Sequence, residues 1–308
     1  MLSVSTPGKV ILFGEHAVVY GRPAIAVPVL QVTATAAIEA ARAGRGTTIL
    51  ATDLACVVHL RDAATDDPLA AIARLTLARI GVPEPDANVT VHSTIPIASG
   101  LGSGAAVSAS IVRALAGFLK CDLDDASVSA LVYEAERLHH GTPSGIDNTV
   151  VVYAQPVYFV RGQPIQVLAV KRPFSLAIGD TGVHSPTKIA VGDVRRAWEE
   201  DRDRLERHFD RIGSVAVRAR AAIESGAVEA LGPLMDENHA RLRDIGVSSD
   251  ELERLVAAAR AAGAAGAKLV GAGRGGSMIA LVDDGTRSAI AEALQRAGAR
   301  GVIVTTVR

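Results

Sequence analysis

Residues 96–106 read Pro-Ile-Ala-Ser-Gly-Leu-Gly-Ser-Gly-Ala-Ala and run directly into a helical pattern that continues to residue 119. Small residues let an anion approach the backbone, and the unpaired N–H groups of a helix start point at it. The stretch is not a Walker A loop, because no Lys-Ser or Lys-Thr pair follows the glycines. It is not the dinucleotide-binding fingerprint either, because the glycine spacing differs. It predicts a phosphate-binding loop or a plain tight turn before a helix.

Residues 7–21 read Pro-Gly-Lys-Val-Ile-Leu-Phe-Gly-Glu-His-Ala-Val-Val-Tyr-Gly and place a short apolar strand between polar residues. A lysine just before a buried strand is held with its ammonium at the strand mouth. There Lys9 would lower the pKa of a nearby hydroxyl or neutralise phosphate charge. Glu15 and His16 follow a glycine at the strand end, where side chains can face a cleft. These residues alone also fit a strand flanked by solvated charges.

Residues 141–148, Gly-Thr-Pro-Ser-Gly-Ile-Asp-Asn, follow a helical pattern that should end at Gly141 and Pro143. We expect Asp147 in a loop, where its carboxylate accepts a hydroxyl proton or captures a cation; the alternative is an Asx turn. Glu136 on the preceding helix is a candidate Mg²⁺ ligand. Glu134 lies two residues away and faces elsewhere on the helix, and spacing alone does not say which of the two faces inward.

Residues 268–277, Lys-Leu-Val-Gly-Ala-Gly-Arg-Gly-Gly-Ser, join two expected strands. Four glycines within residues 271–276 exceed what a hairpin turn requires. We therefore expect the backbone here to approach a ligand closely. Two small-residue loops, a lysine and a loop aspartate together suit phosphoryl transfer, which needs positioning and charge neutralisation more than covalent chemistry.

Around these segments the sequence alternates between strand and helix patterns. In the first half we expect strands over 10–13, 24–32, 88–92 and 150–160, and helices over 68–80, 105–119 and 126–140. In the second half we expect strands over 174–178, 267–270, 278–282 and 302–307, and helices over 191–224, 227–244, 249–262 and 288–297. The order in the second half predicts an antiparallel sheet covered on one face. The pattern changes near residue 170, which predicts two domains, 1–170 and 171–308.

The composition excludes several classes of protein. With 32 basic and 33 acidic residues the formal net charge is -1, which gives no electrostatic case for binding nucleic acid or an anionic membrane. Cys56 and Cys121 are too few for a disulfide framework, and we expect both to be small core residues. No apolar run reaches the roughly 20 residues of a membrane span, and residues 1–9 lack the pattern of a signal peptide. We therefore expect a cytoplasmic protein.

Three of the quoted stretches, 7–21, 96–106 and 268–277, resemble the three motifs of the GHMP kinases in the order in which that family carries them. The residue 141–148 stretch resembles the loop that bears the family's catalytic aspartate. The resemblance covers nearly the whole chain. It implies an α+β fold with a ribosomal-protein-like N-terminal domain and a ferredoxin-like C-terminal domain.

The resemblance also implies roles for individual residues, with ATP and Mg²⁺ as cofactors. Asp147 would act as the base and Lys9 would stabilise the developing alkoxide. Glu136 and Ser103 would hold Mg²⁺. The substrate would be bound by Glu15, His16, Ser144, Gly271, Ala272 and Gly273. ATP would be bound by Pro96, Ser99, Gly100, Leu101, Gly102, Ser103, Gly104 and Ala105.

Within the family, the opening stretch is most similar to that of members that phosphorylate the primary hydroxyl of mevalonate, and so are residues 180–182, 187–188 and 245–248. The resemblance therefore implies the product 5-phosphomevalonate, an isoprenoid precursor, and a homodimer. The alternatives are phosphomevalonate or another small-molecule acceptor, or a catalytically idle nucleotide sensor. Members acting on phosphomevalonate usually have Tyr where His16 stands. The retained Lys9, Glu136 and Asp147 argue against the idle sensor.

Two residues depart from the family pattern. The family loop usually carries two serines, the second of which contributes a hydroxyl to Mg²⁺, and here that position is Gly104. Ser103 or water would take the coordination position, so we expect weakened but not abolished Mg²⁺ binding. Arg274 stands where the family usually has glycine, and it either reaches a phosphate or points to solvent.

Overall fold

The computed structural model describes residues 1–140, 143–184 and 187–308, with the side chains of residues 139 and 140 left aside. The predicted helix stop at Gly141 lies outside the described residues. The chain forms two compact units, one of residues 1–8, 32–96 and 102–154, the other of residues 9–31, 97–101 and 155–308. We call them unit 1 and unit 2. Strands β1 (Leu2–Phe13) and β2 (Ala24–Ala40) run through both, and the division near residue 170 stays a prediction.

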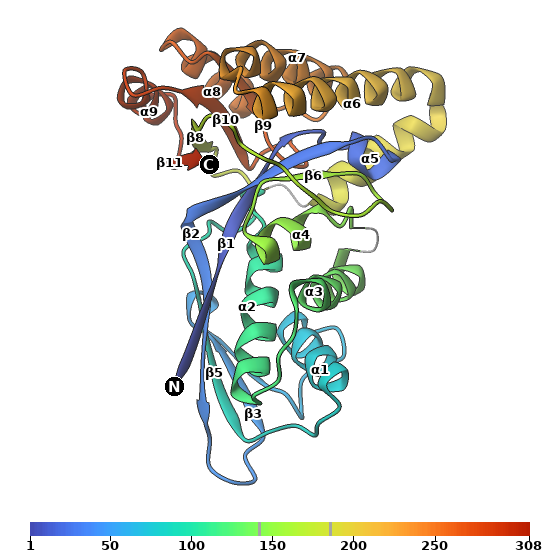
Figure 1. The fold of residues 1–308 in the computed structure, drawn as a ribbon, viewed down its shortest axis with the longest axis vertical. Coiled ribbons are helices and arrows are strands. Elements are labelled where there is room, and N and C mark those ends of the chain that lie inside the picture. The colour runs from blue at the N-terminus through green and yellow to red at the C-terminus, as the bar shows by residue number, and fades with distance from the viewer. Residues whose placement is uncertain (141–142, 185–186) are drawn as a thin grey trace. The chain divides into compact units, whose positions relative to one another are not determined.

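Unit 1 packs helices against one side of a sheet (Figure 1). The C-terminal part of β2 pairs with β5 (Ala87–Ser93), which pairs in parallel with β3 (Thr47–Ala51), and β3 pairs with β4 (Cys56–His59). The short η2 (Thr52–Leu54) connects β3 to β4. Four helices follow: α1 (Pro68–Ile80), α2 (Ser103–Phe118), α3 (Asp125–His140) and α4 (Ile146–Tyr153). Alternation in β2 buries Ala34, Ala36 and Ile38, which builds the core under the helices.

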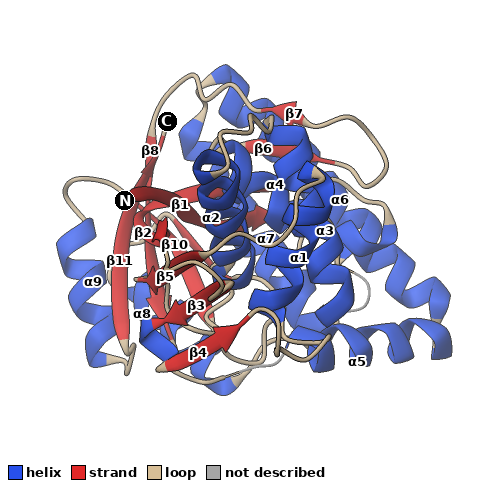
Figure 2. Cartoon of the chain, turned by 90° about the horizontal axis from the view of Figure 1, so that it is seen from below, coloured by secondary structure: helices blue, strands red, loops and turns tan. Residues whose placement is uncertain are grey.

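Unit 2 contains an antiparallel sheet in the order β11-β8-β10-β9. Its strands are β8 (Phe174–Asp180), β9 (Gly266–Leu269), β10 (Ser277–Val282) and β11 (Gly301–Val307). Its helices are α5 (Thr187–Glu200), α6 (Arg202–Ser225), α7 (Leu231–Asp244), α8 (Asp250–Ala261) and α9 (Arg287–Arg296). Helices α8 and α9 pack on the sheet (Figure 2), as expected for an α+β fold, which is confirmed.

The remaining short elements of unit 2 lie near the start of β2. Strand β6 (Val157–Phe159) pairs with the first residues of β2, and β7 (Gln166–Val167) pairs with β6. The 3₁₀ helix η1 (Ala17–Tyr20) precedes β2 and packs against α6, and η3 (Val228–Ala230) precedes α7. The Tyr20 ring stacks on Phe209 of α6, with ring centroids 4.2 Å apart. This contact fixes the segment that follows His16.

One predicted strand and one predicted helix were wrong. Residues 150–160 are not one strand: Val150, Val151 and Val152 lie buried in α4, because tertiary packing outweighs the β preference of valine. Residues 191–224 are not one helix. The chain breaks at Asp201, whose carboxylate accepts the N–H of Arg204 at 3.2 Å and so starts α6 as a new helix.

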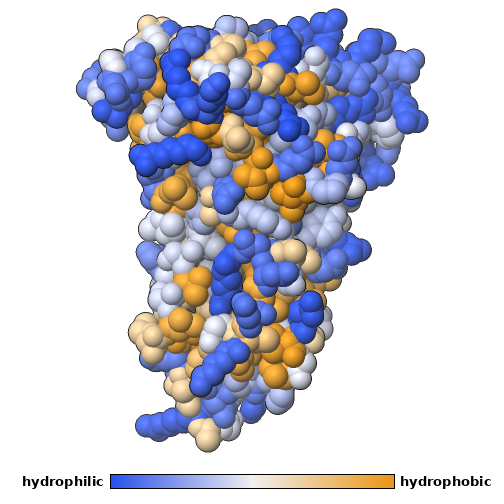
Figure 3. All heavy atoms as spheres, in the orientation of Figure 1, coloured by the Kyte–Doolittle hydropathy of each residue, from blue (hydrophilic) through white to orange (hydrophobic). Residues whose placement is uncertain are grey.

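The surface also differs in part from expectation. Cys56 is exposed and Cys121 half-buried, so the prediction that both are core residues was wrong. The charged stretch over α5 and α6 faces solvent, with Arg195 and Arg202 side chains 64% and 69% exposed. Figure 3 shows mainly hydrophilic residues over this part of the molecule. Within the described ranges, no helix combines the length and apolarity needed to cross a bilayer.

Candidate active site

The start of α2 in unit 1 carries part of the predicted phosphate loop. Gly102 has φ 75° and immediately precedes the helix, and Ser103, Gly104 and Ala105 form its first turn. Gly102 has no side chain to cap the first N–H groups, and Ser103 and Gly104 have little bulk. The structure therefore provides a helix start whose backbone donors an anion can approach, as a phosphate-binding loop requires.

Asp147 lies in the first turn of α4, not in a loop as the sequence suggested. Gly145 precedes the helix with φ 90°, a left-handed conformation that glycine adopts without strain. The Oγ of Ser144 accepts the N–H of Ile146 at 3.3 Å, so Ser144 helps to close the turn. The helix continues through residues 150–153. The apolar run after Asp147 therefore belongs to this helix and not to the predicted strand.

The residues beside Asp147 are fixed by hydrogen bonds within unit 1. The Thr149 hydroxyl donates to the Gly145 carbonyl oxygen at 2.7 Å. The Asn148 amide donates to the backbone oxygen and the Oγ of Ser129 on α3, at 3.1 and 2.8 Å. Asn148 and Thr149 are both buried. The half-buried Asp147 carboxylate is thus carried by a backbone that its neighbours hold rigidly, as a group that must meet a substrate at a defined position requires.

Helix α3 settles which of two glutamates faces inward. Glu134 is 52% exposed and pairs with Arg137 at 3.1 Å, whereas Glu136 is half-buried. Helix α3 packs against α2, which carries Ser103, and against α4, which carries Asp147. A carboxylate and a hydroxyl are oxygen donors that suit Mg²⁺, which takes few protein ligands and keeps waters and phosphate oxygens. In the described parts of the chain no three His, Cys, Asp or Glu side chains cluster as a metal site. The protein would therefore supply only part of the coordination.

Unit 2 brings the other two glycine-rich segments together. The backbone N–H of the buried Lys9 donates to the Leu101 carbonyl oxygen at 2.9 Å. A Cβ added at Gly100 would lie 3.7 Å from the Val270 carbonyl oxygen, and one added at Gly276 would lie 3.2 Å from that of Ser99. Residues 98–101 and 270–276 therefore lie side by side, although more than 160 residues separate them in the sequence.

Gly273 is required by the protein's own backbone. A Cβ added there would lie 1.9 Å from the Val247 carbonyl oxygen, and the φ of Gly273 is 76°. The many glycines of this segment predicted that a ligand approaches the backbone closely. At Gly273 and Gly276, however, the close neighbour is another loop of the same unit. Two further motif segments meet this loop. Thr181 N–H donates to the Gly276 oxygen at 2.8 Å, and the Arg274 N–H donates to Val247 oxygen at 2.8 Å.

His16 contacts this glycine-rich loop directly. Its Nε2 lies 3.0 Å from the Ala272 carbonyl oxygen. A carbonyl can only accept, so Nε2 carries the hydrogen and Nδ1 is left as an acceptor. Burial lowers the pKa of His16 to about 4. The hydrogen bond to Ala272 opposes this shift, and the positive charge of Arg274 adds to it. His16 is therefore neutral near pH 7. Its φ of 59° is strained for a residue with a Cβ, so the surroundings must hold it.

Glu15 is fully buried rather than lining an open surface. One carboxylate oxygen accepts from Lys268 Nζ, and the other accepts from Asn238 Nδ2 at 2.9 Å. The sequence analysis missed both partners. Lys268 did give a signal, because it is the one charged residue in the apolar stretch 261–273. Asn238 gave none, because it lies on a helix whose packing only the fold reveals.

Arg274 does not simply point to solvent, and a role in reaching a phosphate stays a prediction. Its guanidinium pairs with Asp193 of α5 through Nη1 and donates from Nε to the Gly246 carbonyl oxygen at 3.2 Å. The side chain is 38% exposed. Arg274 therefore ties the glycine-rich loop to α5 and to residues 246–247, all within unit 2.

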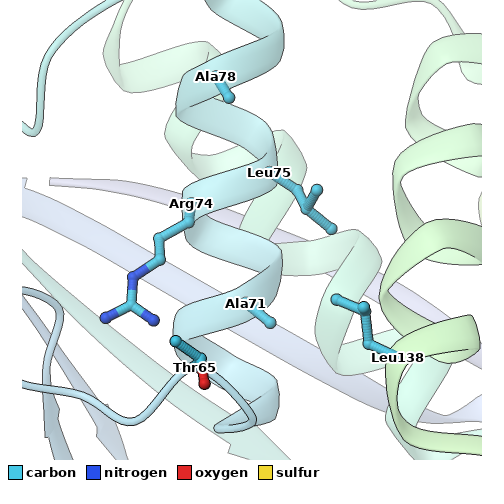
Figure 4. Close-up of a pocket in the computed structure, with 6 residues that line it drawn as sticks. All are labelled: Thr65, Ala71, Arg74, Leu75, Ala78 and Leu138. Atoms are coloured by element: carbon cyan, nitrogen blue, oxygen red, sulfur yellow. The ribbon is translucent and has the colours of Figure 1, made fainter.

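Unit 1 also has a shallow groove (Figure 4). It is lined by Thr65, Ala71, Arg74, Leu75, Ala78 and Leu138. The Arg74 guanidinium donates to the carbonyl oxygens of Leu60 and Ala63, both at 2.7 Å, so its charge stabilises a loop. None of the predicted catalytic or binding residues lines the groove.

Two stretches of the chain match domain models of one known family. Residues 68–155 match the GHMP kinases N terminal domain and residues 219–300 match the GHMP kinases C terminal domain. The chain is 33% identical to a mevalonate kinase of Pyrococcus furiosus, over 99% of this chain and 96% of that protein.

Solved structures give the same result for the fold. L. major mevalonate kinase, solved in complex with R-mevalonate, is 29% identical with a TM-score of 0.85, over 100% of this chain and 96% of that chain. Streptococcus pneumoniae phosphomevalonate kinase has a TM-score of 0.87 over the full length of both chains, but at 17% identity it shows the fold alone. The chain matches both domains of one family and is about one-third identical to a relative along nearly its whole length. The chain therefore belongs to the GHMP kinase family.

Proposed function

We propose that the protein transfers the terminal phosphoryl group of ATP to the primary hydroxyl of mevalonate, giving 5-phosphomevalonate and ADP. The observation that carries the proposal is the 33% identity to a mevalonate kinase over 99% of the chain. The likeness to a structure that holds R-mevalonate supports the same acceptor. The likeness to a phosphomevalonate kinase, at 17% identity, does not favour that alternative.

The proposed chemistry assigns a role to each group of residues. The hydroxyl oxygen attacks the γ-phosphorus, Asp147 accepts the hydroxyl proton, and ADP leaves with the electrons of the broken P–O bond. Lys9 stabilises negative charge on the attacking oxygen. Pro96 and residues 99–105 hold the phosphates. Glu136 and Ser103 hold Mg²⁺, which neutralises phosphate charge when bound. The substrate is bound by Glu15, His16, Ser144, Gly271, Ala272 and Gly273.

The test is ADP release by the purified protein with Mg²⁺-ATP and, side by side, mevalonate, phosphomevalonate or galactose. We expect turnover with mevalonate alone, and a loss of about 10²- to 10⁴-fold in Asp147→Asn, which keeps the shape and removes the base. Turnover with another acceptor would move the enzyme within its family. Tight ATP binding without turnover on any acceptor would support the nucleotide sensor.

Helix α3 provides a matched pair of variants for the metal role. Glu136→Gln should raise the Mg²⁺ concentration for half-maximal activity by about tenfold or more, because a carboxylate ligand is lost. Glu134→Gln removes an equal charge two residues away, from a side chain that is 52% exposed, and should leave the Mg²⁺ dependence unchanged. An equal effect of both variants would contradict the assignment of Glu136. Assembly as a homodimer stays a prediction, which light scattering tests.

A further inference from the structure

A buried ion pair joins Glu15, one of the proposed substrate-binding residues, to Lys268, to which the proposed chemistry assigns no role. Lys268 of β9, Glu15 after β1 and Asn238 of α7 are all fully buried in unit 2. Lys268 Nζ donates to Glu15 Oε1 and to the Leu269 carbonyl oxygen, the latter at 2.6 Å. Asn238 donates to the second oxygen of Glu15 at 2.9 Å. Burial lowers the pKa of Lys268, and the Glu15 carboxylate opposes that shift.

Stability alone does not account for this pair. Removing two charges from water is costly, and apolar residues of similar volume often replace a buried pair without loss of stability. What the pair does that apolar residues would not do is fix one orientation, since a carboxylate bonded on both oxygens has a single position. The pair therefore ties residue 15 to β9 at a defined point.

Strand β9 is itself held firmly by α7. β9 is the edge strand of its sheet, and its outward N–H groups are bonded by side chains of the helix. Asp236 accepts the N–H of Ala267 at 3.0 Å, and His239 Nδ1 accepts that of Leu269 at 3.3 Å. The helix also lies so close that a Cβ at Gly232 would stand 2.1 Å from the Ala265 carbonyl oxygen. β9 is thus a rigid support for Glu15.

Two anchors hold the strained turn that carries His16. On one side, Glu15 is bonded to Lys268 of β9. On the other side, the His16 ring donates to Ala272, in the loop that β9 leads into. Because both anchors belong to one continuous segment, residues 268–272, the imidazole and the loop are fixed relative to each other. The φ of 59° at His16 persists only if such contacts over-determine it.

We infer that Lys268 is a positioning residue: through its buried pair with Glu15 it fixes His16 against the glycine-rich loop and thereby sets the affinity for the acceptor substrate. The inference rests on the proposed function for its choice of substrate. Glu15 then supports the acceptor site through its link to β9, in addition to the substrate contact proposed above.

Steady-state kinetics test the inference with mevalonate as the varied substrate. Lys268→Met should raise the KM for mevalonate about tenfold and lower kcat by less, because misplacing a binding group by a fraction of an ångström weakens binding before it alters the reacting atoms. Glu15→Gln should act in the same direction. The double variant should be no worse than the poorer single one, since both changes break the same link.

A variant pair guards against a simple folding defect. Asn238→Ala removes the neutral donor to Glu15 and leaves no buried charge unpaired, so it should fold even if Lys268→Met does not, and raise KM by about threefold. Arg218→Met is the control. Arg218 pairs at 2.6 Å with Glu237, which lies on α7 like Asn238, but the Arg218 and Glu237 side chains are 49% and 37% exposed. This variant should leave KM unchanged.

A spectroscopic readout separates the inference from the proposed function. In ¹⁵N-labelled protein without substrate, the His16 ring, identified by its loss in His16→Gln, should show a protonated Nε2 and an unprotonated Nδ1. Lys268→Met, or Asn238→Ala if the former does not fold, should shift this signal toward tautomer averaging. An unchanged His16 signal together with an unchanged KM would overturn the inference. If the wild-type protein does not use mevalonate, the proposed function fails and the His16 signal alone decides the inference.

Discussion

Gly104 stands where the family loop usually carries its second serine, so one substitution can restore the hydroxyl that this loop lacks. It lies in the first turn of α2, and an added Cβ would meet no atom within 4 Å. Its conformation is helical, so a side chain causes no backbone strain. A serine there would offer a second hydroxyl beside Ser103, at the end of the helix where the phosphates are proposed to bind.

Gly104→Ser should therefore lower the Mg²⁺ concentration for half-maximal activity by about threefold or more, because it adds a second hydroxyl beside Ser103 to the proposed Mg²⁺ site. The measurement is activity against free Mg²⁺ at saturating ATP. Gly104→Ala is the matched control, since it changes the helix backbone in the same way without a hydroxyl. Equal Mg²⁺ dependence of the serine and alanine variants would contradict the predicted deficit.

His239 makes the free energy of unfolding depend on pH. It is 2% exposed, its Nδ1 accepts the Leu269 N–H, and burial lowers its pKa to about 4, with the Glu253 carboxylate opposing. The unfolded chain binds a proton near pH 6.5, whereas the folded protein does not until about pH 4. The contribution of His239 to the free energy of unfolding is therefore fully present above pH 7 and is lost as the pH falls. Between pH 7 and pH 5 this one group lowers the free energy of unfolding by about 2 kcal/mol.

His239→Asn should remove that part of the pH dependence, because the amide oxygen replaces Nδ1 as acceptor and does not titrate. Urea unfolding at pH 7 and pH 5 measures it: the loss of free energy on acidification should shrink by about 2 kcal/mol relative to wild type. The dependence due to His16, whose pKa burial also lowers to about 4, remains in the variant. An unchanged difference between the two pH values would show that His239 does not contribute.

At the scale of elements, the backbones of α7 and β9 lie unusually close to each other. Gly232 of α7 and Gly266 of β9 face each other, and a Cβ on either would stand 2.1 Å from a carbonyl oxygen of the other segment. This closeness lets the side chains of α7 reach the edge of β9. Propensity alone would disfavour a glycine inside a helix, so Gly232 is explained by packing.

Gly232→Ala should destabilise the protein by about 3 kcal/mol, since the new methyl group meets backbone that cannot move aside. Gly192→Ala on α5 is the matched control: it is also a helical glycine, but its added Cβ would meet nothing within 4 Å. That change should stabilise by about 0.5–1 kcal/mol through helix propensity. Chemical denaturation at constant pH measures both, and a similar sign for the two variants would refute the packing argument.

Whole-molecule organisation follows from how the chain threads its two units. It passes from one to the other between residues 8 and 9, 31 and 32, 96 and 97, 101 and 102, and 154 and 155, which makes five crossings. Unit 2 thus takes Glu15 and His16 from the start of the chain and Lys268 and Ala272 from its end. A cut near residue 170 would separate partners that belong to the same core.

The fragment of residues 171–308 should therefore not fold by itself. It would lack η1 and the first part of β2, and Lys268 would be left as a buried charge without Glu15. Circular dichroism and urea titration of the fragment should show no cooperative transition, whereas the full chain should show one. A cooperative transition in the fragment would mean that residues 171–308 are an independent domain after all.

The sequence by itself determined the family, the α+β class and most helices and strands, because those depend on local periodicity and on motif spacing along the chain. The bounds of α1, for example, were predicted to the residue. It also singled out residues 7–21, 96–106, 141–148 and 268–277 as the segments that could carry chemistry. Only the tertiary structure decided that residues 150–153 continue a helix. It also decided that position 273 must be glycine, because the Val247 carbonyl oxygen lies against it. Only the fold decided that Glu15 is buried against Lys268. The physical reason is common to all three: they depend on contacts between segments far apart in sequence, which override local preference and leave no local pattern.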